Sequence, residues 1–276
     1  MTPPTVRKLG NTVGAEVVGV DRDRLLNDDT LPEWCHQVLD ENGALVFRGL
    51  NLDDDTQVAF SRKLGTLEGA GGLDDGVVFR VTLDPAKNRA AAYLRGTFDW
   101  HIDGATDDIP RMASLLSAHA VADSGGETEF ASTYAAFDDL SDDEQERCRS
   151  LRVVHSFEAA QLLTDPDPAP EELAMWRKRP AKTHPLVWRH RSGRCSLVLG
   201  ATASHVEGMD VEEGRALLAD LLERSTRPDR VYRHEWSVGD LVIWDNRGVL
   251  HRALPYDASS ARDMHRTTIA GDEPIQ

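Results

Sequence analysis

Two short motifs that lie far apart in the chain predict a metal-binding set of side chains. The first is WHIDG at residues 100–104, and the second is WDNRGVLH at residues 244–251. If the first motif is a strand, His101 and Asp103 project from the same face, because side chains alternate along a strand. His251 from another strand would complete a set of two imidazoles and one carboxylate.

Such a set occupies one side of a metal ion and leaves the opposite side open. Two histidines and one carboxylate with open positions are typical of non-haem Fe(II) oxygenases, in which a co-substrate and dioxygen take the vacant positions. A lone His-X-Asp pair also occurs by chance in many proteins, so its spacing alone does not establish a metal site. Because histidine and carboxylate also suit zinc, a zinc hydrolase remains an alternative at this point.

Several further segments resemble the TauD/TfdA family of 2-oxoglutarate-dependent dioxygenases. They are SLLSA at 114–118, GGETEFA at 125–131, SHVEG at 204–208 and the long run 238–271, with weaker matches at 9–17 and 44–49. Within the family, TEFA at 128–131 and the segment 204–208 resemble the 2,4-dichlorophenoxyacetate type more closely than the taurine type. The chain is therefore identified as a member of this family.

The resemblance implies a role for individual residues. It places iron on His101, Asp103 and His251, and it assigns the distal carboxylate of 2-oxoglutarate to Arg262 and Thr128. Without the resemblance, Thr128 would be interpreted as a residue of high β-propensity beside a glycine turn. The cofactor and co-substrates implied are Fe(II), 2-oxoglutarate and O2.

A second arginine follows four residues after the first. In taurine-type members of the family this position, here Arg266, holds the acidic group of the substrate. On a strand, Arg262 and Arg266 would share a face, and a guanidinium offers a planar fork of donors that suits a carboxylate or sulfonate. His265 has the opposite parity and should face away from the site. Without the resemblance, the two arginines would be interpreted as an exposed strand edge.

The activity implied is hydroxylation of a small anionic organic substrate, coupled to decarboxylation of 2-oxoglutarate to succinate and CO2. An aryloxyalkanoate-like carboxylate is the favoured substrate. Alternatives within the family are a taurine or alkyl sulfate type of dioxygenase and a biosynthetic hydroxylase. A catalytically silent jelly-roll module that binds a small acid is the non-enzymatic alternative, although such a module would be free to lose ligands that this chain retains.

The net charge and the cysteines limit the classes of partner and the cellular location expected for this chain. A formal net charge of −16 argues against a nucleic-acid-binding surface and against attraction to an anionic membrane, so an anionic substrate needs a local positive pocket. The three cysteines are odd in number and lack metal-type spacing, which favours free thiols in a reducing cytoplasm. The sequence shows no export signal and no apolar run of about 18 residues. A homo-oligomer remains open.

The length of 276 residues suits one domain, residues 1–276, that is mainly β with peripheral helices. The family resemblance implies a double-stranded β-helix, or jelly roll. Hydrophobic periodicity and turn residues predict helices at 31–39, 54–64 and 211–223, a helix opened by Ser141, and strands at 44–47, 77–81, 113–121, 230–236 and 241–244. Residues 237–240 are predicted to form a tight hairpin, and the segments 69–99 and 164–182 are candidate lids.

Overall fold

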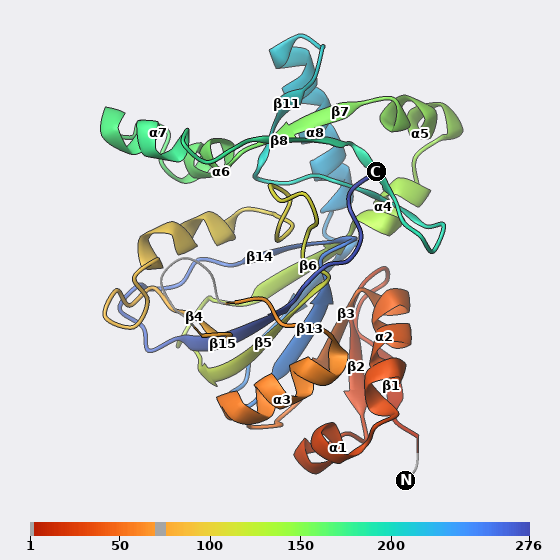
Figure 1. The fold of residues 1–276 in the computed structure, drawn as a ribbon, viewed down its shortest axis with the longest axis vertical. Coiled ribbons are helices and arrows are strands. Elements are labelled where there is room, and N and C mark those ends of the chain that lie inside the picture. Colours follow the sequence, from red (N-terminus) through yellow and green to blue (C-terminus); the bar gives the residue numbers. More distant parts are fainter. Residues whose placement is uncertain (1–2, 70–75) are drawn as a thin grey trace.

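The centre of the molecule is a pair of β-sheets stacked face to face (Figure 1), in a computed structural model that describes residues 3–69 and 76–276. The larger sheet has the strand order β1-β2-β3-β13-β5-β15-β4, and the smaller has the order β12-β6-β14. The larger sheet consists of β1 (Thr5–Lys8), β2 (Ala15–Val18), β3 (Ala44–Phe47), β4 (Phe79–Val81), β5 (Ala113–Ala120), β13 (Leu241–Asp245) and β15 (Asp263–Ile269). The smaller sheet consists of β6 (Thr128–Ser132), β12 (Val231–His234) and β14 (Val249–Ala253).

Alternation along the strands divides the core into layers. In β13, Leu241 and Ile243 join the cluster under the helices, whereas Val242 and Trp244 join the cluster between the two sheets. The helices on the outer face of the larger sheet are α1 (Arg22–Asn27), α2 (Leu31–Asn42) and α3 (Asp54–Leu64). Adjacent residues of one strand point to opposite faces of the sheet. Two adjacent residues of β15 can therefore belong to different sites.

A cap of helices and short strands covers the outer face of the smaller sheet (Figure 1, top). Leu250 of β14 and Ala131 of β6 pack there with Leu218 and Leu221. The cap consists of α4 (Thr133–Asp138), α5 (Asp142–Arg149), α6 (Phe157–Thr164), α7 (Pro170–Trp176), α8 (Val211–Ser225), β7 (Arg152–His155), β8 (Lys182–Pro185), β9 (Val187–Arg189), β10 (Cys195–Leu197) and β11 (Ala203–Val206). The 3-10 helix η1 (Ala91–Phe98) contacts α6.

Most predicted elements are confirmed. Helix α3 and strand β3 have the predicted bounds, α2 and α8 extend past their predicted ends, and Ser141 opens α5 with a capping box to Glu144. The predicted hairpin at 237–240 is wrong: this segment connects β12 in one sheet to β13 in the other. Asp240 accepts hydrogen bonds from the backbone of Ser237 and Gly49, which holds the segment as a corner between the layers.

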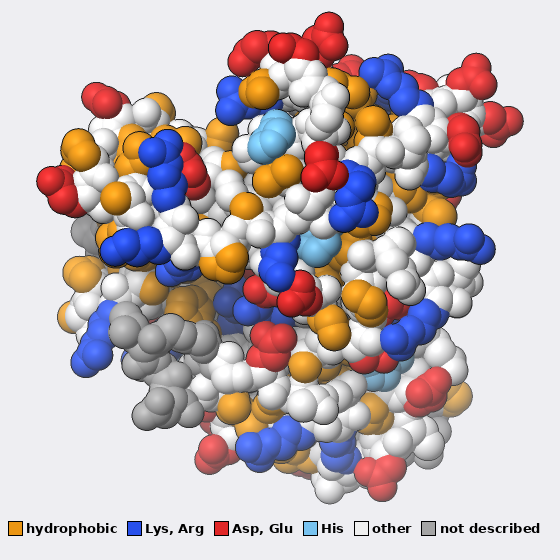
Figure 2. All heavy atoms as spheres, turned by 45° about the horizontal axis from the view of Figure 1, so that its top comes forward, with side chains coloured by type: hydrophobic (Ala, Val, Ile, Leu, Met, Phe, Trp, Pro, Cys, Tyr) orange, Lys and Arg blue, Asp and Glu red, His pale blue; other side chains and the backbone are white. Residues whose placement is uncertain are grey.

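The surface is mixed in charge. Figure 2 shows acidic and basic side chains interspersed over the face turned to the viewer. Among the described residues, no helix is both long enough and apolar enough to span a membrane.

Candidate metal centre

A backbone bridge holds the two histidines of the site together. The amide of His101 donates to the carbonyl of His251, and the amide of His251 donates to the carbonyl of His101, each at 3.0 Å. Their ring centroids are 4.1 Å apart. His251 lies in β14, but His101 forms only an isolated bridge and Asp103 lies in the turn that follows. The expectation that one regular strand carries His101 and Asp103 is therefore wrong, although the two side chains do converge.

The turn brings Asp103 back to both imidazoles. Its Oδ1 lies 3.9 Å from Nε2 of His101, and its Oδ2 lies 3.9 Å from Nε2 of His251. One donor atom from each of the three residues lies within 4.8 Å of the other two, close enough to share one metal ion. Gly104 enables the turn, because its φ of 88° is a conformation that side-chain-bearing residues rarely adopt.

Neighbouring groups orient the donors. Nδ1 of His101 lies 2.8 Å from the carbonyl oxygen of Asp99, and because a carbonyl can only accept, Nδ1 must carry the proton. Nε2 of His101 is then left with a free lone pair beside Asp103, as a metal ligand requires. Asp103 itself accepts a hydrogen bond from the hydroxyl of Ser114, which is held in turn by the amide of Asn246, each at 3.0 Å.

The charge states also suit metal binding. Burial alone would raise the pKa of Asp103, but the charge of Arg266 holds that pKa below its ordinary value, so the carboxylate stays ionised. Burial, together with the neighbouring His101, lowers the pKa of His251, so its imidazole stays neutral. An ionised carboxylate and a neutral imidazole are the forms that bind metal ions.

Arg262 forms a buried cationic group beside Gly126, just before β6, the strand in which Phe130 pairs with His251. It is 3% exposed, its Nη2 donates to the carbonyl of Gly126 at 3.1 Å, and its guanidinium lies 4.7 Å from the ring centroid of Tyr256. Its Nη1 is buried without a hydrogen-bond partner among the described residues. Thr128 is also buried, and its Oγ1 accepts a hydrogen bond from Trp236 at 2.9 Å, so the hydroxyl proton remains available to another acceptor.

Arg266 extends from β15 to the metal-binding set. Its Nη1 donates to Oδ2 of Asp103 at 3.2 Å, and its guanidinium lies 5.2 Å from the ring centroid of Phe79. As predicted, His265 faces the other side of the sheet, where its ring contacts Asp54. Arg262 precedes β15 rather than lying in it, so strand parity does not by itself explain why both arginines reach this region.

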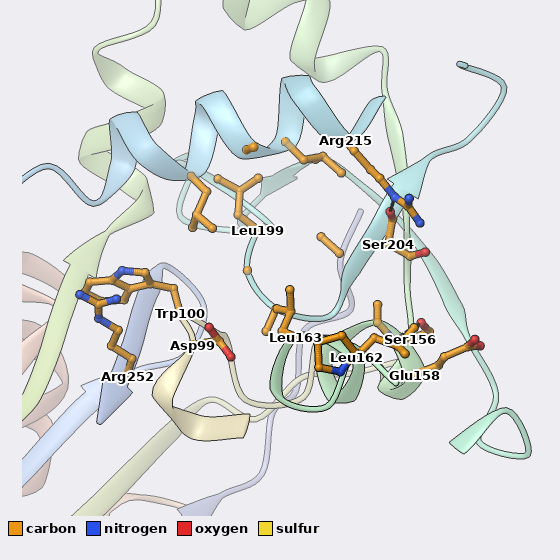
Figure 3. A pocket seen from close by; sticks show the side chains of 18 residues that line it. Asp99, Trp100, Ser156, Glu158, Leu162, Leu163, Leu199, Ser204, Arg215 and Arg252 are labelled. Atoms are coloured by element: carbon orange, nitrogen blue, oxygen red, sulfur yellow. Dashed lines mark hydrogen bonds between the residues drawn. The ribbon is translucent and has the colours of Figure 1, made fainter. Parts of the chain in front are cut away.

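A separate pocket of about 720 Å3 lies on the outer face of β14 (Figure 3). Arg252, which follows His251 and faces the opposite way, lines this pocket and lies 4.6 Å from the ring of Trp100. The candidate lid 164–182 borders this pocket through Pro166 rather than the metal-binding set. Part of the other candidate lid, residues 70–75 of 69–99, lies outside the described residues.

Some supporting residues were not predicted from the sequence. Ser114 and Asn246 fall in segments that matched the family, but no spacing rule connects them to Asp103. Asp99 acts through its backbone carbonyl, which leaves no trace in the residue type. Tyr256, an aromatic residue between His251 and Arg262, was the one available signal, because tyrosine faces commonly stack on arginine.

The chain matches a known protein family along nearly its whole length. The model for "Taurine catabolism dioxygenase TauD, TfdA family" matches residues 5–268. A 2,4-dichlorophenoxyacetate dioxygenase of Cupriavidus pinatubonensis, named α-ketoglutarate-dependent, is 42% identical, with 95% of this chain and 96% of the relative covered. The chain belongs to the TauD/TfdA family of dioxygenases.

Two further relatives support this assignment. An (S)-phenoxypropionate/α-ketoglutarate-dioxygenase of Sphingobium herbicidovorans is 33% identical, with 97% of this chain and 95% of the relative covered. The crystal structure of AAD-2 in complex with Mn(II) and N-oxalylglycine has a TM-score of 0.85 and 34% identity, with both chains covered in full. This TauD/TfdA member is therefore a 2-oxoglutarate-dependent dioxygenase, an enzyme class that uses Fe(II), 2-oxoglutarate and O2.

Proposed function

We propose that this chain hydroxylates a small aryloxyalkanoate-like carboxylate, with Fe(II) held by His101, Asp103 and His251. The observation that carries the proposal is the convergence of these three donors, with Oδ1 and Oδ2 of Asp103 each 3.9 Å from an imidazole Nε2. Arg262, whose Nη1 is buried without a hydrogen-bond partner among the described residues, contacts Gly126 just before β6, the strand that pairs with the strand of His251. When bound, the iron supplies the oxidative chemistry that decarboxylates 2-oxoglutarate to succinate and CO2 and hydroxylates the substrate.

The co-substrate role falls to Arg262 and Thr128. A buried guanidinium with an unsatisfied N–H is costly on its own, and a carboxylate that accepts this N–H would offset the cost. The distal carboxylate of 2-oxoglutarate suits this position, with the free hydroxyl proton of Thr128 as a second donor. Because both side chains are buried, these contacts exclude water and gain strength from the low local dielectric.

The substrate role falls to Arg266. Its Nε is buried without a hydrogen-bond partner in the described part of the chain, and its Nη1 is already directed at Asp103. A substrate carboxylate bound at Arg266 would lie next to the metal ligands, which brings its neighbouring C–H bonds to the reacting centre. Phe79, which contacts the same guanidinium, would pack against an aromatic ring attached to that carboxylate.

A taurine or alkyl sulfate type of oxygenase is the second candidate. A guanidinium accepts a sulfonate or sulfate as readily as a carboxylate, so Arg266 alone does not distinguish them. The aryloxyalkanoate type is preferred because both relatives described above are named for phenoxy acids.

We also propose a double-stranded β-helix fold and one domain over residues 1–276. Stacked sheets with the site between them support the double-stranded β-helix, and a single domain over 1–276 agrees with ligands drawn from the middle and the end of the chain. Cys35, Cys148 and Cys195 are free, which suits the proposed cytoplasmic location. A homo-oligomer and the absence of nucleic-acid and membrane partners stay predictions.

The test is a panel of acids supplied to the Fe(II)-loaded enzyme with 2-oxoglutarate, scored by substrate-stimulated succinate formation. The panel should contain aryloxyacetates, aryloxypropionates, taurine and alkyl sulfates. Stimulation by the aryloxy acids is the expected result. Stimulation by sulfonates or sulfate esters alone would favour the second candidate, and no stimulation by any aryloxy acid would overturn the proposed substrate class.

A further inference from the structure

A second group of potential metal ligands lies on the opposite face of the larger sheet, under helix α3. It consists of Asp54, His119 and His265, and one donor atom from each lies within 4.8 Å of the others. Asp54 is the first residue of α3, His119 lies near the end of β5, and His265 lies in β15. Because His265 and Arg266 are adjacent in a strand, they face opposite sides, so this group is separate from the metal centre described above.

A β-bulge places His119 beside His265. Asp263 pairs with Ala120 and Met264 pairs with Ala118, so the register leaves His119 without a partner in β15. Bulges re-aim side chains, and here the two imidazoles stack with centroids 3.7 Å apart and planes inclined by 19°. Two nitrogen donors are thus brought together by a local departure from regular pairing.

Several polar atoms of the group are buried and unsatisfied. Nε2 of His119, Nε2 of His265 and Oδ1 of Asp263 have no hydrogen-bond partner among the described residues. His265 is only 7% exposed, and its Nε2 lies 3.5 Å from Oδ1 of Asp263. Buried polar atoms are normally hydrogen-bonded, so three such atoms in one place indicate a missing partner.

Carboxylate oxygens of Asp54 and Asp263 lie beside the imidazoles, where they could also contact the missing partner. Nδ1 of His265 lies 2.5 Å from Oδ1 of Asp54, and Nε2 of His119 lies 4.0 Å from the same oxygen. Arg80 and Lys87 contact Oδ2 of Asp263, which leaves its Oδ1 facing His265. Oδ1 of Asp54 thus faces both imidazoles, whereas Asp263 lies beside the ring of His265, as carboxylates that orient metal-binding histidines do.

We propose that Asp54, His119 and His265 form a second divalent-cation site, and that it takes zinc or a cation of similar preference. Imidazole nitrogens combined with a carboxylate oxygen match the ligands of zinc. Burial and the neighbouring His265 lower the pKa of His119, which favours the neutral imidazole needed for coordination. The bound ion would tie the N-terminus of α3 to β15, the strand that carries Arg266.

The experiment counts Zn(II) bound to the whole chain. The protein is stripped with a chelator, incubated with Zn(II), desalted and analysed for metal. Wild type should retain two equivalents, and His119→Ala and Asp54→Asn should each retain one. Asp55→Asn is the matched control, because Asp55 is an exposed carboxylate in the same first turn of α3 but outside the group, and it should retain two.

A second set of variants separates the two sites. His251→Ala should retain one equivalent, and the double variant His251→Ala/His119→Ala should retain none. In the His251→Ala background, Zn(II) should raise the melting temperature, and His119→Ala should abolish that shift. Equal zinc content in wild type and His119→Ala, or a loss confined to Asp54→Asn, would overturn the proposal, whatever the oxygenase assays report about the first site.

Discussion

Arg266 donates a hydrogen bond from Nη1 to Oδ2 of Asp103 at 3.2 Å, which connects the arginine proposed to bind substrate with a carboxylate proposed to bind iron. The same contact holds the pKa of Asp103 low against the effect of burial. Substrate recognition and metal binding therefore share one ion pair, and a change at either residue should affect both.

Replacing Arg266 with alanine should raise the KM for the primary acid by tenfold to a hundredfold, because a charge-assisted contact contributes about 1.5–3 kcal/mol. The KM for 2-oxoglutarate should change far less. Titrating each compound separately in a succinate assay tests this expectation, and Arg266→Lys should recover part of the loss. Equal effects on both KM values would argue against a specific substrate role.

Replacing His101 or Asp103 with alanine should abolish iron-dependent turnover and leave the fold largely intact. Each change would remove one of the three side-chain donors proposed to hold the iron. Succinate release and iron content of the purified variants are the measurements, with circular dichroism to verify folding. Asp107→Ala is the control, because Asp107 lies in the same loop and pairs with Arg111 instead. Undiminished turnover in His101→Ala or Asp103→Ala would contradict the ligand assignment.

Arg262→Ala should raise the 2-oxoglutarate requirement by tenfold to a hundredfold, with a much smaller effect on the iron requirement, because it removes the buried cation proposed to hold the distal carboxylate. Arg252→Ala is a suitable comparison, since Arg252 lies on the opposite face of the smaller sheet and pairs with Glu129. An unchanged 2-oxoglutarate titration in Arg262→Ala would refute the role.

Gly126→Ala should also weaken 2-oxoglutarate binding, without removing any charge. A Cβ at this position would lie 2.9 Å from Nε of Arg262, and the φ of +77° is unfavourable for alanine. Gly193→Ala is the control that separates backbone strain from displacement of Arg262. Gly193 has a φ of +86°, but nothing lies within 4 Å of a Cβ added there. The KM for 2-oxoglutarate should rise only in Gly126→Ala, whereas both variants should lose some stability. A normal KM in Gly126→Ala would show that Arg262 tolerates displacement.

Stability should decrease in mild acid because of His155. Burial lowers the pKa of His155 to about 3 from an unfolded value near 6.5. Between these values the unfolded chain binds a proton that the folded chain excludes, so the free energy of unfolding falls as pH falls from 6.5 toward 3, by up to about 1.4 kcal/mol per pH unit for this site. Denaturant titrations should show a shallower decrease for His155→Gln; parallel curves would contradict this origin.

The sequence predicted elements with strong local patterns. The bounds of α3 were predicted correctly, and the structure shows Asp53 as its N-cap and Gly65 after its end. The uninterrupted apolar run of β3 suited a strand buried on both faces. The hairpin at 237–240 was predicted wrongly because tight turns within a sheet and corners between sheets use the same residue types. Which sheet a strand joins depends on contacts far away in the sequence.

The candidate site, too, was predicted only in part from the sequence. The family resemblance picked out His101, Asp103 and His251, whose donor atoms converge in the structure. The assumed strand for His101 and Asp103 was wrong, because the geometry depends on a turn at Gly104 and on pairing with β14. The second histidine group under α3 was missed altogether. Its members come from three separate segments, and the bulge that aligns His119 with His265 leaves no periodic pattern in the sequence.

The reciprocal amide–carbonyl bonds between His101 and His251 imply an order of events during biosynthesis. A nascent chain that has emerged only as far as β5 carries His101 and Asp103 but not the strand that closes the centre. With the proposed ligands, high-affinity iron binding would therefore require β14 to be synthesised and paired with His101 first.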